Sequence, residues 1–220
     1  MMGWAAAASV RAGAGAVHVH VRGPDLEQSL DPEDVARCVA AVRQAIGRVP
    51  MGISTLLNIV QDPEKRVAIA SKWTVRPDFA SVNFNEAGSP ALASRLIEMN
   101  VGVEAGLSDA AAAEELVRSG LGNRCLRILI EPRGADAPAA LKSADEMIAV
   151  LDRAKITPPR LLHGSNASAW GVIDAAARRG YDTRAGLEDI LLMPDGSTAA
   201  DNAAIVAEAV RRVGQSQPRI

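Results

Sequence analysis

The chain has 220 residues, of which 48% are hydrophobic and 23% are charged, and its formal net charge is −2. These values are typical of one globular domain, expected over residues 1–220. The near-neutral charge and the 3% of aromatic residues argue against nucleic-acid binding. No apolar run is long enough to cross a bilayer, and the N-terminus lacks the features of a signal peptide. We therefore expect a cytoplasmic protein that binds no membrane, with Cys38 and Cys125 as reduced, buried thiols.

Short β-like runs alternate with amphipathic helical stretches along the chain. The chain opens in a predicted helix over residues 1–12. Predicted strands cover residues 16–22, 49–55, 80–84, 102–106, 126–131, 160–163 and 182–188. Predicted helices cover residues 32–46, 108–119, 137–154, 167–179 and 199–213. Strands separated by helical crossovers pair in parallel.

This alternation, uninterrupted by a linker, favours an α/β fold of the (β/α)8 TIM-barrel type over a doubly wound sheet. Gly13 and Gly15 precede a predicted strand instead of following one, so they do not form a dinucleotide-binding fingerprint. The predicted strands are one short of eight. We therefore expect a (β/α) barrel that lacks its first strand, incomplete at its N-terminal side.

Two of the three histidines of the chain lie in the first predicted strand. His18, His20 and Arg22 alternate with valines, which places their side chains on one face of a strand. The two imidazoles are then about 7 Å apart at their Cα atoms, from a rise of about 3.3 Å per residue, and can converge on one metal ion. A strand whose histidines are solvent-facing or hydrogen-bonded, without a metal, remains the alternative.

Polar residues also collect at the C-terminal ends of the other predicted strands, where barrels carry their active sites. They are Ser54, Thr55, Ser81, Asn83, Asn85, Glu104, Glu131 and His163. The hydroxyl residues can equally be turn residues, and each glutamate can be a buried partner of an arginine. His163 can cap the following helix. For Glu104 we favour a role in the site.

The last predicted strand completes a possible metal site. Alternation places Arg184 and Glu188 on one face, and Asp189 follows directly. In a closed barrel this strand lies close to the first strands of the chain. Zinc accepts imidazole and carboxylate ligands, and three protein ligands leave one position open. His18, His20 and Glu188 meet that need.

These segments resemble a known family. The segments carrying the resemblance are residues 13–22 and 184–189, with Asn202 downstream. They are similar to the β-keto acid cleavage enzymes, also called 3-keto-5-aminohexanoate cleavage enzymes. The resemblance extends over essentially the whole chain, and the two motifs together are fairly specific. The central segments 81–84, 103–107 and 161–164 resemble a subgroup of the family.

The resemblance implies a zinc-dependent (β/α)8 barrel that condenses a β-keto acid with acetyl-CoA, releasing acetoacetate and a new CoA thioester. His18, His20 and Glu188 match the metal ligands of the family. Asp189 matches the catalytic base, and Arg184 matches the arginine that assists it.

Further site residues follow from the same resemblance. Ser54 matches a family serine, and Ser81 replaces a family threonine while keeping the hydroxyl. We expect Arg22, Asn83, Glu104 and His163 to bind substrate. The expected cofactor is Zn²⁺ with acetyl-CoA as co-substrate, and the expected assembly is a homo-oligomer, a tetramer by resemblance. The helix after residues 164–166 is a candidate phosphate site for CoA.

Two departures from the family pattern bear on activity. The acidic residue of the first family strand has no counterpart here, so we expect a member shortened at its N-terminus. Leu56 and Leu57 follow Thr55 where the family favours glycines, which predicts a narrower substrate loop. Two alternatives stay open: a catalytically impaired protein that keeps zinc and an acid ligand, and a different metal-dependent barrel lyase, such as an aldolase, that needs no CoA.

Overall fold

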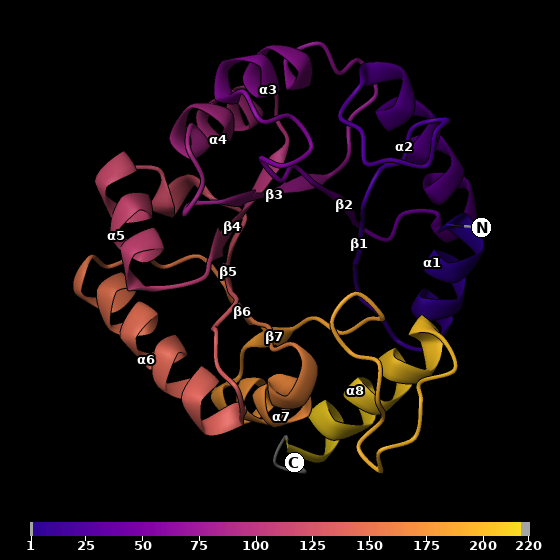
Figure 1. The fold of residues 1–220 in the computed structure, drawn as a ribbon, viewed down its shortest axis with the longest axis vertical. Helices are drawn as coiled ribbons and strands as arrows, with labels where there is room; N and C mark the ends of the chain where they lie inside the picture. The colour runs from indigo at the N-terminus through magenta and orange to yellow at the C-terminus, as the bar shows by residue number, and fades with distance from the viewer. Residues whose placement is uncertain (1, 217–220) are drawn as a thin grey trace.

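The structure is a computed structural model that describes residues 2–216 (Figure 1). Its helices are α1 (Met2–Arg11), α2 (Pro32–Ile46), α3 (Pro63–Ala70), α4 (Ser89–Glu98), α5 (Ala110–Ser119), α6 (Ala137–Arg153), α7 (Ala169–Arg179) and α8 (Asn202–Ser216). Its strands are β1 (Val17–Val19), β2 (Met51–Ser54), β3 (Phe79–Asn83), β4 (Gly102–Leu107), β5 (Arg127–Ile130), β6 (Arg160–Leu162) and β7 (Asp182–Thr183). None of the described helices is long and apolar enough to span a membrane.

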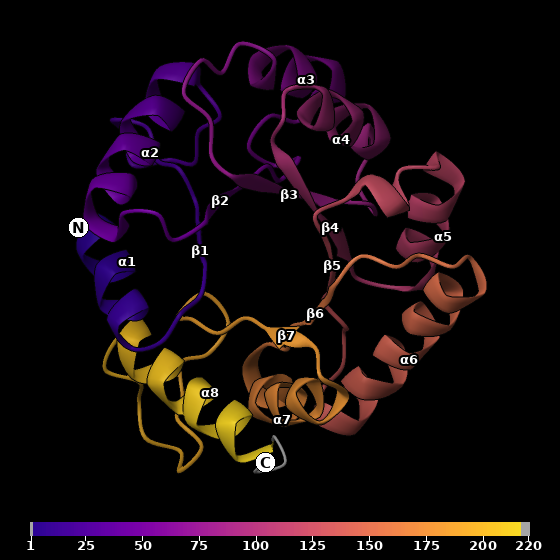
Figure 2. The same cartoon turned by 180° about the vertical axis from the view of Figure 1, so that it is seen from behind.

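The strands form one parallel sheet in the order β1-β2-β3-β4-β5-β6-β7, so each pairs with its neighbours along the chain. Figures 1 and 2 show the sheet curled into an arc with the helices on its outer side. Among residues 2–216, no ladder joins β7 to β1. The layer of helices does close, because α1 packs against both α2 and α8. The fold is therefore a TIM-like barrel whose sheet lacks one strand, in agreement with the sequence prediction.

Local signals in the sequence explain how the helices begin and end. Asp31 precedes α2 and accepts a hydrogen bond from the backbone N–H of Glu33, with Pro32 in the first turn. Gly47 follows the helix with φ of +63°, a conformation that costs glycine little. The helix buries one apolar face, formed by Val35, Val39, Val42 and Ile46.

Two helices were not anticipated from the sequence. Helix α3 is short, although Asp62 caps it by accepting hydrogen bonds from two backbone N–H groups. Helix α4 follows Gly88, which has a left-handed backbone and offers no side-chain cap. Short length and a missing cap weaken the periodic and boundary signals on which sequence reasoning depends.

The two faces of the sheet have different compositions. On β3, Ala80 and Val82 belong to the apolar core that includes residues of the surrounding helices, whereas Ser81 and Asn83 point the other way. Gly52 of β2 lies against Phe79, and a Cβ at Gly52 would be only 2.1 Å from that ring. On the inner face of the arc, the aromatic ring of Phe79 thus lies at the start of β3, and polar side chains follow towards its C-terminal end.

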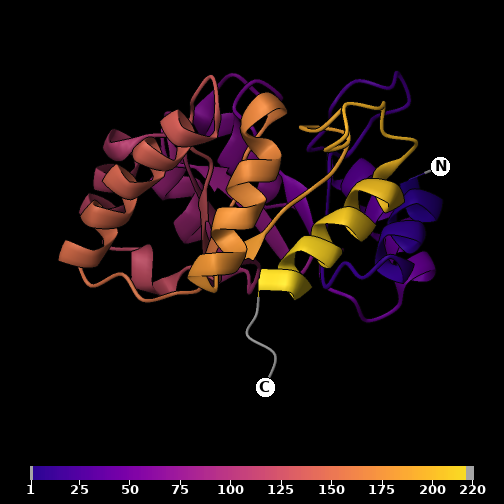
Figure 3. The same ribbon diagram turned by 90° about the horizontal axis from the view of Figure 1, so that it is seen from below.

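A similar hairpin follows the first and the last strand, at the same end of the barrel (Figure 3). One hairpin is held by an antiparallel bridge between Arg22 and Gln28, and the other by a bridge between Leu192 and Thr198. Both turns contain a residue with a left-handed backbone, at φ of +69° for Leu26 in the first and at +85° for a glycine in the second.

Candidate active site

The candidate site lies towards the C-terminal ends of the strands. One part of it is a row across four neighbouring strands, which runs from the end of β2 to the start of β5. Ser54 pairs with Ser81, Ser81 with Glu104, and Glu104 with Arg127. The four side chains therefore form one row on the inner face of the sheet. Ser54, Ser81 and Glu104 are all buried.

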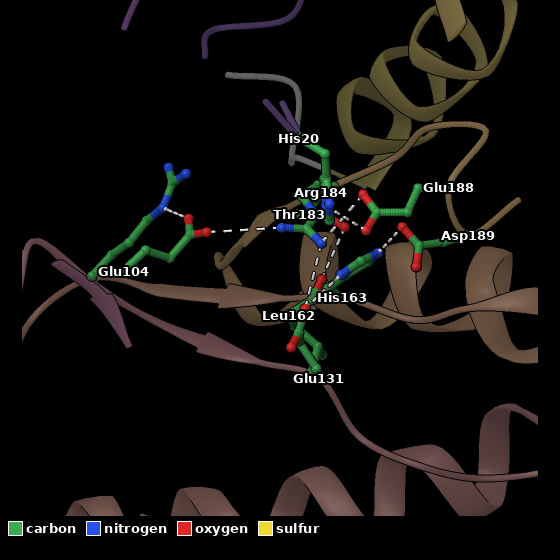
Figure 4. A network of polar contacts seen from close by, with 10 residues as sticks. His20, Glu104, Glu131, Leu162, His163, Thr183, Arg184, Glu188 and Asp189 are labelled. Atoms are coloured by element: carbon green, nitrogen blue, oxygen red, sulfur yellow. Dashed lines mark hydrogen bonds and ion pairs between the residues drawn. The ribbon is translucent and has the colours of Figure 1, made fainter. Parts of the chain in front are cut away.

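The histidines of the first strand meet Glu188 across the unpaired ends of the sheet. The His18 and His20 rings lie with centroids 5.5 Å apart, at 75° to each other. His20 Nε2 is 3.0 Å from Glu188 Oε1 (Figure 4). His18 Nδ1 is buried and has no hydrogen-bond partner among the described residues. The sequence prediction that Glu188 lies near the histidines is thus realised in the fold.

Their surroundings favour different charge states for these three side chains. Burial, with Arg184 and His20 nearby, lowers the pKa of His18 well below its usual value, so its imidazole is neutral. The hydrogen bond to Glu188 raises the pKa of His20. The same hydrogen bond from His20 lowers the pKa of Glu188 to about 2, so its side chain is a carboxylate.

Arg184 lies between three carboxylates. Its guanidinium nitrogens are 3.8 Å from Glu104 Oε1, 3.5 Å from Glu131 Oε1 and 3.9 Å from Glu188 Oε2. The side chain of Glu104 is fully buried and pairs with Arg127 through Oε2, while its Oε1 accepts no hydrogen bond. Glu104 is therefore the buried partner of an arginine, as the first alternative held, and its role in the site remains a prediction.

His163 lies between two acidic residues. Its Nε2 is 2.9 Å from Asp189 Oδ2, and its Nδ1 is 3.4 Å from Glu131 Oε1. The contact with Asp189 is an ion pair without the alignment of a hydrogen bond. Burial opposes the charged imidazolium, but the two carboxylates outweigh it and raise the pKa of His163. His163 is therefore placed to hold Asp189 in position.

The segment that carries Glu188 and Asp189 is a turn, so the predicted strand over residues 182–188 was too long. The strand ends at Thr183. The carbonyl of Gly186 accepts hydrogen bonds from the N–H groups of Asp189 and the next residue, and Asn202 Oδ1 accepts one from the N–H of Leu187. These bonds curl the chain, and alternation no longer decides where the side chains point.

Arg22 lies apart from this cluster. The strand ends at Val19, and the hairpin begins before the alternation reaches Arg22. Its guanidinium is exposed, donates to the carbonyl of Leu26, and lines a hollow together with Met2 and Asp34. Its place on the same face as the two histidines remains a prediction. Its expected contact with substrate remains a prediction.

The remaining predicted residues lie on β2, β3 and the loops beyond them. Asn83 leans over Gly106 of β4, where a Cβ would be 2.3 Å from Asn83 Oδ1. The hydroxyl of Thr55 donates to the carbonyl of Ser81, so Thr55 joins the end of β2 to the middle of β3. Leu56 and Leu57 are half-buried in the loop after β2.

The donor set suits zinc by its chemistry. It offers a neutral imidazole with an unpartnered buried nitrogen, a second imidazole and an ionised carboxylate. As the side chains stand, no three His, Cys, Asp or Glu residues within the described part of the chain are grouped to hold an ion. His20 Nε2 instead bonds to Glu188, and a metal would take the place of that shared proton.

Four residues of the cluster were given no specific role in the site from the sequence. They are Gln28, Arg127, Glu131 and Asn202, which contact His20, Glu104, His163 and Leu187 respectively. Glu131 was noted at a strand end and Asn202 beside the segment 184–189, so both carried a signal. Gln28 carried none, because only the hairpin brings it back to the strand.

The fold places the protein in the class of TIM-like barrels. A thiamine phosphate pyrophosphorylase from Pyrococcus furiosus has a similar structure, with a TM-score of 0.58 and 11% identity, covering 98% of this chain and 91% of that one. At this identity the likeness shows a shared barrel fold only. The family model for beta-keto acid cleavage enzymes matches residues 2–220, and the chain belongs to that family. A search of curated proteins found no match.

Proposed function

We propose that the protein is a zinc-dependent enzyme that exchanges an acyl unit between a β-keto acid and acetyl-CoA. The bond between the keto carbon and the carboxymethyl group of the β-keto acid is broken. The carboxymethyl group joins the acetyl group to form acetoacetate, and the remaining acyl group leaves as its CoA thioester. One observation carries the proposal: two histidines and a Glu-Asp pair from opposite ends of the chain meet at the strand ends.

His18, His20 and Glu188 are the residues that would hold zinc. When bound, zinc supplies Lewis acidity towards the keto oxygen and orients the substrate. Asp189 is the proposed base, because its carboxylate contacts only one imidazole in the cluster and keeps one oxygen for a substrate proton. The contact of His163 with Asp189 Oδ2 would keep the carboxylate in place while the carboxylate accepts the proton.

Arg184 and the two serines complete the proposed substrate site. Arg184 is 18% exposed and can bind the substrate carboxylate, because none of its contacts with the three glutamates is closer than 3.5 Å. Ser54 and Ser81 lie side by side on the inner face and can donate to substrate oxygens. Asn83 and Glu104 border the same space and are proposed to select the acyl group.

The test is product formation with matched variants. Purified protein with zinc and acetyl-CoA is incubated with a panel of β-keto acids, including 3-keto-5-aminohexanoate, and acetoacetate is measured by mass spectrometry. Asp189→Asn should keep its zinc but lose turnover by at least about a hundredfold. Glu188→Ala should lose both zinc and turnover.

Three results would count against the proposal. Zinc retained in both His18→Ala and Glu188→Ala would overturn the ligand assignment. Substrate cleavage without acetyl-CoA would indicate a lyase. Bound zinc without acetoacetate from any acid would indicate a protein that binds but does not turn over. The proposed tetramer is checked separately by light scattering.

A further inference from the structure

We propose that Gln28 is a positioning residue that fixes the tautomer and direction of the His20 imidazole so that Nε2 is presented to the metal. This inference rests on the proposed zinc site. Gln28 Oε1 lies 2.7 Å from His20 Nδ1, the shortest distance that either imidazole of the pair makes to a described side chain. The two residues are eight positions apart and meet only because the chain folds back.

The hairpin after β1 holds Gln28 at this place through its backbone. The bridge between Arg22 and Gln28 aligns the two arms. The N–H of Gly23 donates to the carbonyl of Glu27 at 2.9 Å, and the N–H of Ser29 donates to the carbonyl of Val21 at 3.0 Å. Backbone hydrogen bonds on both sides of Gln28 therefore fix its main chain, and its side-chain oxygen contacts the His20 imidazole.

The chemistry of the contact sets the tautomer. An amide oxygen only accepts hydrogen bonds, so Gln28 Oε1 requires a proton on His20 Nδ1. Once a metal replaces the proton that Nε2 shares with Glu188, the ring is neutral and its lone pair on Nε2 faces the metal. The position of Glu188, 3.0 Å from Nε2, shows that this nitrogen points across the unpaired sheet ends towards the other proposed ligand. Partners of this kind on the second nitrogen orient metal-binding histidines.

His18, two residues earlier in β1, provides the contrast. Its Nδ1 is buried and accepts no hydrogen bond from the described residues, so no side chain fixes its tautomer in the way that Gln28 does for His20. Gln28 thus acts on one ligand of the pair only. Its removal should disturb His20 and leave His18 unchanged.

Zinc affinity, measured by competition with a chromogenic chelator, tests the role of Gln28. Gln28→Leu should weaken zinc binding about ten- to a hundredfold, the usual effect of losing such a partner. Gln28→Glu should retain the affinity, because a carboxylate also accepts from Nδ1. Thr198→Leu, at the equivalent position of the second hairpin, is the matched control and should bind zinc like the unmodified chain. Unchanged affinity in Gln28→Leu would overturn the proposal.

A second measurement needs no metal and separates this inference from the zinc site itself. In chelator-treated Glu188→Ala protein the carboxylate no longer competes for Nε2. Nitrogen NMR of His20 at alkaline pH should then show the proton on Nδ1, and the added Gln28→Leu change should shift it to Nε2. If the unmodified chain binds no zinc, the proposed function fails. An unchanged tautomer in the double variant would overturn the role of Gln28 alone.

Discussion

The two cysteines differ in how deeply the thiol is buried. Burial raises the pKa of Cys125 to about 11, and its Sγ contacts the carbonyl of Leu121. Cys38 is half-buried beside Met2, and burial raises the pKa of its thiol as well. Both cysteines are free, and the prediction of burial holds for Cys125, whereas Cys38 is only half-buried.

Reactivity with a thiol reagent should follow these pKa values. The thiolate is the reactive form, and at about pH 8 a pKa of about 11 leaves only about one thiol in a thousand ionised. In the folded protein Cys38 should therefore be alkylated well before Cys125, as read by peptide mass spectrometry. Both should react at similar rates in urea. Equal rates in the folded protein would contradict the environment described for Cys125.

Single residues of the site were predictable to different degrees. His18, His20 and Glu188 were predicted to lie together because alternation in two predicted strands, barrel closure and the ligand preference of zinc agree. Arg22 follows a three-residue strand, so alternation alone does not decide where its guanidinium lies. The contact of Gln28 with His20 was not predictable, because it depends on the backbone geometry of the hairpin and not on the residue types in it.

At the scale of elements, the two similar hairpins offer an internal comparison. The left-handed position is occupied by Leu26 in one and by Gly196 in the other, and Leu26 is 75% exposed. Left-handed backbone costs a residue with a side chain about 1–2 kcal/mol more than glycine. An exposed leucine recovers little of that cost through packing.

Exchanging the two residue types should therefore have opposite effects. Leu26→Gly should raise the free energy of unfolding by about 0.5–1 kcal/mol, after the greater flexibility of glycine in the unfolded chain is subtracted. Gly196→Leu should lower it by about 1–2 kcal/mol. Urea unfolding measures both. A destabilised Leu26→Gly protein would show that Leu26 makes an energetically important contact.

The loops after β2 and β3 are joined by a buried ion pair. Arg66 of α3 is fully buried and donates to Glu86 Oε2 at 2.5 Å, and to the carbonyl of Thr55 at 3.1 Å. The same Glu86 oxygen accepts the N–H of Leu57 at 2.9 Å. This pair holds the loop that follows Ser54 against the loop that follows β3.

Breaking the pair should be costly. Glu86→Gln removes the negative charge and leaves Arg66 buried without an ionised partner, which should lower the free energy of unfolding by about 3–5 kcal/mol. Glu98→Gln is the matched control, because its pair with Arg95 is exposed and should contribute at most about 0.5 kcal/mol. Similar midpoints of urea unfolding for the two variants would show that burial does not decide the strength of the pair.

The order of the elements was more predictable than their bounds. The order of strands and most of the helices follow from apolar periodicity, since the central strands bury one face against helices. The turn over residues 186–189 was not predictable from periodicity, because the same alternation of residues fits a strand. Its form depends on Asn202, which lies beyond the loop and binds the N–H of Leu187.

At the scale of the whole molecule, the proposed metal would join the two unpaired edges of the sheet. His18 and His20 follow one edge and Glu188 the other, and His20 and Glu188 already touch. A ligand that binds only the folded chain stabilises it in proportion to its concentration. Zinc at about a hundred times its dissociation constant should therefore raise the free energy of unfolding by about 2.7 kcal/mol.

Thermal unfolding with and without zinc measures this effect. The midpoint should rise with zinc in the unmodified chain and stay fixed in Glu188→Ala. Magnesium, which prefers oxygen ligands, serves as the control ion and should change neither protein. An equal zinc effect in both proteins would place the stabilising site elsewhere.

The open arc also determines when the site can exist during folding. Each strand pairs with its neighbours along the chain, so the sheet can grow through contacts between nearby segments. The contact of His20 with Glu188, by contrast, joins residues separated by most of the sequence and closes a loop of that length. A chain that has formed every strand pair but has not brought its two edges together has a sheet and no active site. Recovery of zinc binding after dilution from urea should therefore lag behind recovery of secondary structure.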